Sequence, residues 1–421
     1  MEIKPITHLN ATVSVPGSKS YTQRALIIAA LAEGRSTVQN PLIAEDTGYV
    51  MEALKALGAE IVVAGHEVTI MGTGGHLQNP GGEIYLGNNG TAMRLLTGVV
   101  ALGRGSFTLT GSPRLCQRPI KPLLDALTTM GVDARTKNTD GYPPVIVHAH
   151  GLQGGKVTFA DIESSQYISA MLICAPLAEN DTVIELQGQI PSLPYVDMTV
   201  DVMEAFGAEV IKEAPFRYWV KSGQQYHGRG YPIEGDCSSA SYFFLAAALC
   251  KGTIRVQHIN PRTLQGDIEL LPIMERLGCS VNRGEDWVEV VGGELPAGDY
   301  TFDLGGMPDM VPTLAAMAAV RPGRTVITNV PHLRMKESDR LAALATELKK
   351  MGVRAEERED GLVIEGNSPH GAEIETYNDH RIAMSFAILG LVVPGIRIKD
   401  AGCVDKSFPG FWGELKQLYP R

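Results

Sequence analysis

The sequence predicts an α/β protein of the α+β kind, built from six copies of one helix-and-strand unit and divided into two domains. Three observations support this prediction: the chain length, an internal repeat, and the alternating hydrophobicity that closes each repeat. The chain has 421 residues, too many for one small core at about 150 residues per domain. Hydrophobic residues make up 44% of the chain and charged residues 20%, an ordinary globular balance that argues against disorder.

Each unit opens with a small or polar turn, continues as an Ala- and Leu-rich helix, and reaches a β-branched strand after a Gly or Asn. The six copies begin at Ser18, Gly87, Glu163, Gly235, Met307 and Tyr377. Recurrence of the same order of elements at a regular spacing is the mark of a structural repeat.

A second helix follows in each of the first five copies and ends in a hydrophobic residue and a glycine. Glycine after an amphipathic helix typically forms a left-handed cap. Alternating segments such as 59–72 and 353–366 then predict antiparallel strands with one exposed face, so each unit reads β-α-β-α-β-β. The glycines are separated by 73, 76, 71 and 74 residues and are Gly58, Gly131, Gly207, Gly278 and Gly352.

The repeat is longer than the roughly 20–50 residues of open solenoids, so we expect closed groups of repeats. Three plus three is the natural division, with the chain crossing between the groups near 234–236. We therefore expect one domain at 16–234 and another formed by 1–15 plus 235–421.

Charge and hydropathy exclude several classes of partner. With 37 Lys and Arg against 47 Asp and Glu, the net charge is −10, which argues against nucleic-acid binding. The longest apolar stretch, Ile382–Ile396, has 15 residues and is too short to span a bilayer, so no membrane partner is expected. The first residues lack a leader pattern, which indicates a cytoplasmic protein. The six cysteines form no CxxC pair, and no metal is expected.

The polar starts of the repeat helices are the candidate functional positions. Segments 17–24, 87–94 and 377–381 each place basic side chains near a helix N-terminus, where unpaired N–H groups and the helix dipole favour anions. Several such ends, if they converge, would form one anion site. The alternative at each position is a capped helix start with a solvated basic residue.

Two further segments add charge of both signs. Arg114 and Arg118 lie in a Pro-rich loop, and a guanidinium fork suits phosphate or carboxylate oxygens, although a solvated loop is the alternative. The segment KESDR is expected to open a helix with Lys336 and Arg340 on one face. Glu337 between these cations suits proton transfer.

Together, the segments GSKSYTQR, GNNGTAMR, RPIKP, ESSQ, MPD, KESDR, YNDHR and DKSFPGFW closely resemble the 5-enolpyruvylshikimate-3-phosphate synthase family, in order, from about Val13 to Trp412. The resemblance implies an enolpyruvyl transferase-like fold of two domains, each with three repeats around a pseudo-threefold axis. The N-terminal strand would return to the second domain, and the substrates would bind in the cleft.

The resemblance also implies the reaction. Phosphoenolpyruvate would give its enolpyruvyl group to the 5-hydroxyl of shikimate 3-phosphate and release phosphate, by addition and elimination through a tetrahedral intermediate. This step belongs to aromatic amino-acid biosynthesis, and it would need no metal or organic cofactor. The family further suggests a monomer.

Motif matching assigns the site residues. Asp309 is the candidate base for the 5-hydroxyl, Glu337 the candidate proton donor to the methylene carbon, and Lys19 would assist the leaving phosphate. The residues implied to hold shikimate 3-phosphate are Lys19, Ser20, Arg24, Ser164, Ser165, Gln166, Ser192, Tyr195, Asp309 and Lys336. Those implied to hold or lie near phosphoenolpyruvate are Lys19, Asn88, Gly90, Arg94, Arg118, Gln166, Arg340, His380, Arg381 and Lys406. Eight cations in these sets minus the two carboxylates leave an expected excess of six positive charges.

The chain departs from the family pattern at three positions. His332 replaces a common Asn, Leu95 a common Pro, and Asn89 a frequent Ala. These changes affect the expected shape of both substrate pockets. Because Gly90 leaves its pocket uncrowded, we expect glyphosate, the family's inhibitor, to compete with phosphoenolpyruvate.

Two other functions are considered. An enolpyruvyl transferase acting on UDP-N-acetylglucosamine shares the repeat architecture, but it has GAKN in place of GSKS, and its loop cysteine lies farther from the RP step than Cys116 does. A non-catalytic anion-binding protein would need the cations, but Asp309 and Glu337 would weaken its affinity. Both carboxylates therefore favour an enzyme.

Overall fold

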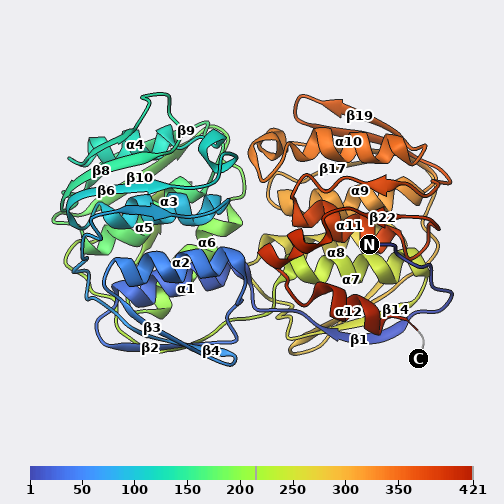
Figure 1. Ribbon diagram of the computed structural model, residues 1–421, viewed down its shortest axis with the longest axis horizontal. Coiled ribbons are helices and arrows are strands. Elements are labelled where there is room, and N and C mark those ends of the chain that lie inside the picture. The colour runs from blue at the N-terminus through green and yellow to red at the C-terminus, as the bar shows by residue number, and fades with distance from the viewer. Residues whose placement is uncertain (214–215, 420–421) are drawn as a thin grey trace. The chain divides into compact units, whose positions relative to one another are not determined.

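The computed structural model describes residues 1–213 and 216–419, and the chain divides into two compact units (Figure 1). Unit 2 is Gly17–Ile233, and unit 1 combines Met1–Pro16 with Glu234–Arg421. Each unit has its own hydrophobic core. The predicted α/β class is confirmed.

Unit 2 contains three repeats, each with two helices and a four-stranded sheet. Its helices are α1 (Lys19–Leu31), α2 (Glu45–Ala56), α3 (Gly90–Val100), α4 (Lys121–Thr129), α5 (Gln166–Cys174) and α6 (Pro194–Ala205). Its strands are β2 (Arg35–Gln39), β3 (Glu60–Ala64), β4 (Glu67–Met71), β5 (Glu83–Tyr85), β6 (Arg104–Thr110), β7 (Asp133–Thr136), β8 (Val145–His150), β9 (Gly155–Ala160), β10 (Thr182–Gln187), β11 (Ile211–Glu213), β12 (Arg217–Val220) and β13 (Gly230–Pro232).

The sheets of unit 2 share one topology, with orders β13-β2-β4-β3, β5-β6-β8-β7 and β11-β12-β10-β9. In each sheet, the strand after the first helix pairs antiparallel with its own hairpin and parallel with a strand contributed by the preceding repeat. For the first repeat that parallel strand is β13, from the end of the third repeat, so that Gly230 pairs with Thr37. The three repeats therefore close into a ring.

Unit 1 contains the other three repeats. Its helices are α7 (Cys237–Cys250), α8 (Leu270–Arg276), α9 (Val311–Val320), α10 (Arg340–Lys350), α11 (His380–Leu389) and α12 (Phe411–Gln417). Its strands are β1 (Asn10–Ser14), β14 (Thr253–Gln257), β15 (Ser280–Arg283), β16 (Trp287–Val291), β17 (Tyr300–Asp303), β18 (Gly323–Thr328), β19 (Arg354–Arg358), β20 (Gly361–Gly366), β21 (Glu373–Ile374) and β22 (Arg397–Ile398). The sheets are β1-β14-β16-β15, β17-β18-β20-β19 and β21-β22.

The sixth repeat differs from the predicted β-α-β-α-β-β pattern because, among the described residues, no hairpin of its own follows β22, and its second helix is the short α12. The first residues of the chain take the hairpin's place. Glu2 forms an antiparallel bridge with Arg397, and the Ile3 N–H donates to Ile396 O at 3.0 Å. The N-terminal strand β1 also lies in unit 1, parallel to β14. Both elements tie the chain's beginning to the repeats at its end.

The two helices of a repeat differ in burial. The first helices, such as α5 and α9, are buried on nearly all faces, as their Ala- and Leu-rich sequences require. The second helices, such as α2 and α10, are buried on one face only. All five glycines after the second helices have the predicted left-handed φ, at +105°, +84°, +95°, +92° and +77° in chain order. No helix in the described part of the chain has the length and apolar character needed to cross a membrane.

Candidate active site

In unit 2, the N-termini of the three buried helices are joined by side chains. Asn89 caps α3 by accepting from Ala92 N at 2.9 Å, and its Nδ2 donates to Gln23 Oε1 in α1 at 3.0 Å. Arg94 of α3 donates from Nη1 to Oε1 of Gln166, the first residue of α5, at 2.8 Å. Within this unit, two of the three helix starts named from the sequence, 17–24 and 87–94, therefore lie together, joined by the start of α5.

Lys19 is the first residue of α1, directly after the N-cap Ser18. Its Nζ lies 3.3 Å from Asp46 Oδ2, and the two side chains are 14% and 2% exposed. The backbone carbonyl of Asp46 also accepts from Asn89 Nδ2 at 2.8 Å. Asp46 therefore links the starts of α1, α2 and α3, a role that the sequence did not reveal.

Arg24 holds two other predicted site residues in place. Its guanidinium donates to Ser20 O and Tyr195 O at 3.0 Å each, to Thr199 Oγ1 at 2.7 Å, and to Ser169 Oγ at 3.4 Å. Complete burial lowers the pKa of Arg24 to about 10, although the nearby Tyr195 opposes the shift. The group remains a cation at neutral pH.

Two more guanidinium groups lie at the start of α3. Arg94 donates from Nη2 to Pro119 O at 2.8 Å, and Arg118 donates from Nη1 to Asn88 O at 3.4 Å. Both arginines are 5% exposed. A Cβ at Gly90 would lie 2.4 Å from Arg118 Cζ, so only glycine permits this approach. Buried arginine forks of this kind suit phosphate or carboxylate oxygens.

The third repeat contributes hydroxyl and amide groups. Ser164 Oγ accepts from Gln166 N at 3.3 Å, and Gln166 Nε2 donates to Thr91 Oγ1 at 2.8 Å. Ser165 is buried directly before α5. Ser192 has a left-handed φ of +57°, an uncommon conformation for a residue with a side chain and one that recurs at functional sites.

In unit 1, Arg340 forms the centre of a buried charge cluster. Its Nη1 lies 2.8 Å from Asp309 Oδ1, its Nη2 lies 2.8 Å from Glu337 Oε2, and its Nε lies 2.8 Å from Asp379 Oδ2. Nη2 also donates to Asp379 Oδ1 at 3.3 Å. Four of its N–H donors thus point at carboxylates, of which Asp379 is fully buried and was not predicted.

Arg381 provides the second cation beside Asp309. Its Nη2 donates to Asp309 Oδ2 at 2.7 Å and to Ser238 Oγ at 3.3 Å, and its Nη1 donates to Tyr242 Oη at 3.3 Å. Ser238 and Tyr242 belong to α7, and Arg381 belongs to α11. Asp309, just before α9, therefore lies between two guanidinium groups where three buried helices of unit 1 meet.

The placement of Lys336 corrects one prediction. Helix α10 begins only at Arg340, because Asp339 caps it by accepting from Ala342 N at 3.0 Å. Lys336 lies before the cap in extended backbone and does not share a helix face with Arg340. Glu337 reaches Arg340 from the same pre-helical segment.

Lys406 and His380 are both buried and do not lie exposed at the surface. Lys406 ends a short 3₁₀ helix, Ala401–Lys406, and is 6% exposed. His380 opens α11 but is fully buried, with Nδ1 3.8 Å from Asp379 Oδ1. Its imidazole therefore presents no surface to a ligand, unlike the neighbouring Arg381.

His332, one of the departures from the family pattern, is a neutral buried imidazole. Burial lowers the pKa of His332 to about 3, and the positive charge of Lys336 adds to the shift while Asp309 opposes it. Its Nε2 makes no hydrogen bond to the residues that the structure describes.

The charge balance is less positive than predicted. In unit 2, Asp46 pairs with Lys19, and four cations minus this carboxylate leave an excess of three. In unit 1, Asp379 pairs with Arg340, and four cations minus Asp309, Glu337 and Asp379 leave an excess of one. These pairings join separate repeat elements, and sequence spacing could not show them. Among the described residues, no group of His, Cys, Asp and Glu is arranged to hold a metal.

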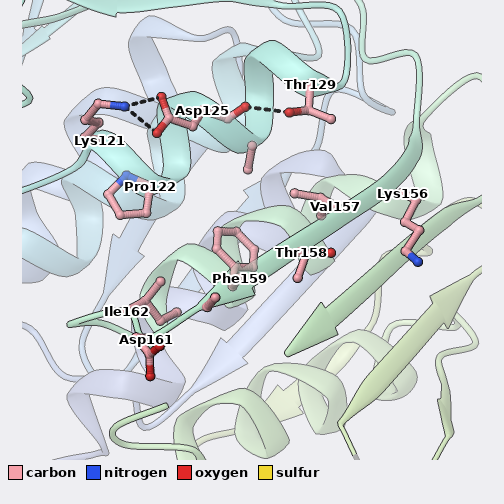
Figure 2. A pocket seen from close by; sticks show the side chains of 12 residues that line it. Lys121, Pro122, Asp125, Thr129, Lys156, Val157, Thr158, Phe159, Asp161 and Ile162 are labelled. Atoms are coloured by element: carbon pink, nitrogen blue, oxygen red, sulfur yellow. Dashed lines mark hydrogen bonds and ion pairs between the residues drawn. The ribbon is translucent and has the colours of Figure 1, made fainter. Parts of the chain in front are cut away.

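A surface groove of about 620 Å³ lies between α4 and β9 (Figure 2) and contains none of the predicted site residues. Lys121, the first residue of α4, lines this groove and pairs with Asp125 at 2.5 Å. Lys156 pairs with Glu185 at 2.9 Å. Both groove lysines thus already have carboxylate partners at the surface, and the groove does not form part of the candidate site.

The repeated fold and the charge clusters at its helix starts agree with the resemblance to an enolpyruvyl transferase-like enzyme. Comparison with known sequences gives the family. The sequence model for EPSP synthase (3-phosphoshikimate 1-carboxyvinyltransferase) matches residues 3–415. The chain belongs to this family.

Individual proteins that are similar to this chain carry the name of the same family. The 3-phosphoshikimate 1-carboxyvinyltransferase of Syntrophobacter fumaroxidans is 45% identical over 419 residues, covering 99% of each chain. That of Nostoc punctiforme is 41% identical over 412 residues, covering 97% of this chain and 96% of the relative. The solved EPSP synthase of Acinetobacter baumannii superposes with a TM-score of 0.82 at 30% identity, covering 99% of this chain and 97% of that one.

Proposed function

We propose that the side-chain clusters of the two units act together on shikimate 3-phosphate and phosphoenolpyruvate. The protein transfers the enolpyruvyl group to the 5-hydroxyl and releases phosphate, as its family membership indicates. The observation that best supports the assignment of roles is the pairing of Asp309 with two guanidinium groups. Its Oδ1 lies 2.8 Å from Arg340 Nη1, and its Oδ2 lies 2.7 Å from Arg381 Nη2. The relatives' names do not favour the UDP-sugar reaction or a binding-only protein.

Unit 2 supplies most of the binding groups for shikimate 3-phosphate in this proposal. Its hydroxyl and amide side chains suit a sugar-like ring, and Lys19 suits a phosphate at the start of α1. Arg24 holds Ser20 and Tyr195 in place through their carbonyl groups. The residues concerned are Lys19, Ser20, Arg24, Ser164, Ser165, Gln166, Ser192 and Tyr195, joined by Asp309 and Lys336 from unit 1.

Phosphoenolpyruvate binds to the cations of both units in this proposal. Its carboxylate and phosphate oxygens draw Arg340 and Arg381 away from Asp309 and Glu337, whose carboxylates hold them at 2.7 to 2.8 Å without substrate. Asp379 keeps Arg340 anchored through Nε during this exchange. The other binding groups are Lys19, Asn88, Gly90, Arg94, Arg118, Gln166 and Lys406, while the buried His380 supports Arg381 from within the helix start.

The released carboxylates then carry out the proton transfers. Asp309, which is ionised, takes the proton of the 5-hydroxyl as the hydroxyl oxygen bonds to C2 of phosphoenolpyruvate. Glu337, which takes up a proton from water once Arg340 has turned to the substrate, gives that proton to the methylene carbon. In the elimination, the bond from C2 to the phosphate oxygen breaks with its electron pair, and the methyl group returns one proton to Glu337. Lys19 donates toward the leaving phosphate. The products are the enolpyruvyl ether and inorganic phosphate.

The test measures phosphate release from the purified protein with phosphoenolpyruvate and either shikimate 3-phosphate or UDP-N-acetylglucosamine. We expect release only with the shikimate ester, and a loss of turnover of about 10²–10⁴ in Asp309→Asn. Asp286→Asn, which alters a 70% exposed carboxylate of unit 1, is the control and should retain activity. Release with the UDP-sugar would overturn the substrate assignment, and full activity of Asp309→Asn would remove Asp309 as the base.

The family also supports a monomeric, cytoplasmic enzyme, and each set of binding groups is supplied by one chain. Light scattering after size-exclusion chromatography should give a mass near 45.3 kDa with and without both substrates. A dimer mass under assay conditions would contradict this part of the proposal.

A further inference from the structure

The same contact recurs in several repeats, between the segment that begins the second helix and the first turn of the buried helix. In the first, second and fifth repeats the contacts involve predicted site residues: Lys19 with Asp46, Arg118 with Asn88 O, and Asp309 with Arg340. The fourth repeat has no residue among the predicted site sets. It nevertheless makes the equivalent contact, because Ser238 Oγ donates to Asp267 Oδ2.

Asp267 is buried and is connected to Asp309, the proposed base, through two side chains. It lies in the 3₁₀ turn Gly266–Glu269 before α8 and is 5% exposed. The Ser238 hydroxyl, which donates to Asp267, accepts from Arg381 Nη2 at 3.3 Å, and the same nitrogen donates to Asp309 Oδ2 at 2.7 Å. A continuous line of contacts therefore runs from Asp267 to Asp309.

This line of contacts determines which way the proton of the Ser238 hydroxyl points. An ionised carboxylate only accepts hydrogen bonds, so Asp267 draws the Ser238 proton toward itself. The serine lone pairs are then directed at Arg381, whose guanidinium only donates. Without the carboxylate, the hydroxyl is free to turn its proton toward the cation, and Arg381 loses an acceptor.

Asp267 is a poor stabilising residue in its present place. Its second oxygen, Oδ1, makes no hydrogen bond to any described residue. Burial raises the pKa of Asp267 to about 7, the negative charges of Asp309 and Asp236 add to the shift, and Arg381 and the Ser238 hydrogen bond oppose it. Because an ionised buried carboxylate without a direct cation costs folding free energy, stability does not explain this residue.

We propose that Asp267 is a positioning residue for the transfer reaction. Through Ser238 it orients Arg381, and Arg381 in turn holds Asp309 toward the 5-hydroxyl and receives phosphoenolpyruvate. The inference rests on the proposed function, in which Asp309 is the base and Arg381 binds phosphoenolpyruvate. It adds the fourth repeat to a reaction otherwise assigned to the other five.

Steady-state kinetics on Asp267→Asn, Ser238→Ala and the double variant test this inference. We expect each single change to lower kcat/KM for phosphoenolpyruvate by about 10- to 100-fold, because misplaced reacting groups cost factors of this size. The double variant should be no worse than Ser238→Ala, since Asp267 acts only through that hydroxyl. Ser238→Thr, which keeps the hydroxyl, should restore most of the activity.

Two further measurements separate positioning from a structural role. The wild-type kcat/KM should fall as the pH drops through about 7, where Asp267 takes up a proton, and Asp267→Asn should lack this acid limb. Above pH 7 the same variant should melt no earlier than the wild type. Ser241→Ala, which removes a 1% exposed hydroxyl from the same helix, should change kcat/KM less than about twofold.

The inference is overturned if Asp267→Asn keeps wild-type kcat/KM and its acid limb, or if the effects of the two single changes multiply in the double variant. Asp309→Asn is measured in parallel. If Asp309→Asn remains fully active, the proposed base is wrong, whereas an inactive Asp309→Asn beside an unaffected Asp267→Asn refutes only the positioning role.

Discussion

Asp379 should stabilise unit 1 more than an ordinary helix cap, and replacing it tests the description of the buried charge cluster. Its Oδ2 accepts from Arg340 Nε at 2.8 Å and from Ser338 Oγ at 3.0 Å, while its Oδ1 accepts from Arg381 N at 3.0 Å to cap α11. Both Asp379 and Arg340 are at most 1% exposed. Asp379→Ala therefore removes a helix cap and one partner of a buried ion pair together.

The expected cost follows from these two losses. Removing one partner of a buried pair costs up to about 3–5 kcal/mol, an upper bound here because Asp309 and Glu337 still pair with Arg340, and losing an aspartate cap costs about 1 kcal/mol. Asp339→Ala is the matched control, because Asp339 caps α10 but pairs with Arg334 at 3.1 Å where the two side chains are 39% and 32% exposed. That change should cost about 1–2 kcal/mol. The free energy of unfolding should thus be lower for Asp379→Ala than for Asp339→Ala, by up to about 3 kcal/mol.

The assay must report on unit 1 alone, since two-unit proteins need not unfold in one step. Of the three tryptophans, Trp287 and Trp412 belong to unit 1 and Trp219 to unit 2. Urea unfolding followed by fluorescence in a Trp219→Phe background therefore isolates unit 1. Equal midpoints for Asp379→Ala and Asp339→Ala would refute the description of the Arg340 cluster, and Asp379→Asn, which keeps an oxygen for the cap, should fall between the alanine variant and the wild type.

Four other predictions concern the site. Glu337→Gln should lower turnover by roughly 10²–10⁴ with a modest change in KM, and near-normal turnover would remove Glu337 as the proton donor. Because the pKa of His332 is lowered to about 3, the folded protein disfavours the proton that the unfolded chain takes up below about pH 6.5, so stability decreases as the pH falls; urea unfolding should show the wild type losing about 1 kcal/mol relative to His332→Asn between pH 7.5 and 5.5. Glyphosate at millimolar concentration should compete with phosphoenolpyruvate in the phosphate-release assay, and unaffected rates would refute the expectation that Gly90 leaves room for it. Gly90→Ala should raise KM for phosphoenolpyruvate, since a Cβ there would lie 2.4 Å from Arg118 Cζ; an unchanged KM would show that Arg118 does not bind it.

The repeat pattern predicted most of the fold because it reflects local chemistry. The glycine caps at positions such as Gly58 and Gly352 depend only on the end of one helix, and all have the expected left-handed φ. The sixth repeat was different. Its sheet is completed by Glu2 and Ile3, nearly 400 residues away along the chain, and no periodicity reports such a pairing.

The candidate site shows the same division between local and distant information. Motifs identified the cations, because each belongs to a short segment that can be recognised by itself. They missed Asp46, Asp267 and Asp379, because the meaning of these carboxylates depends on side chains supplied by other elements or repeats. The cap at Asp339 was readable in principle, since aspartate before an apolar helix is a usual N-cap, but the charged pair at Lys336 and Arg340 suggested a helix one turn too long.

The use of the first residues to finish the last sheet bears on how the chain folds. Unit 2 is one uninterrupted segment, Gly17–Ile233, and its ring is complete once β13 pairs with β2. Unit 1 cannot complete its third sheet until Arg397 has been made, although Glu2 leaves the ribosome first. Domains tend to fold as units in the order of synthesis, and contacts of large sequence separation form slowly. The inserted unit is therefore expected to fold while the flanking unit is still being translated.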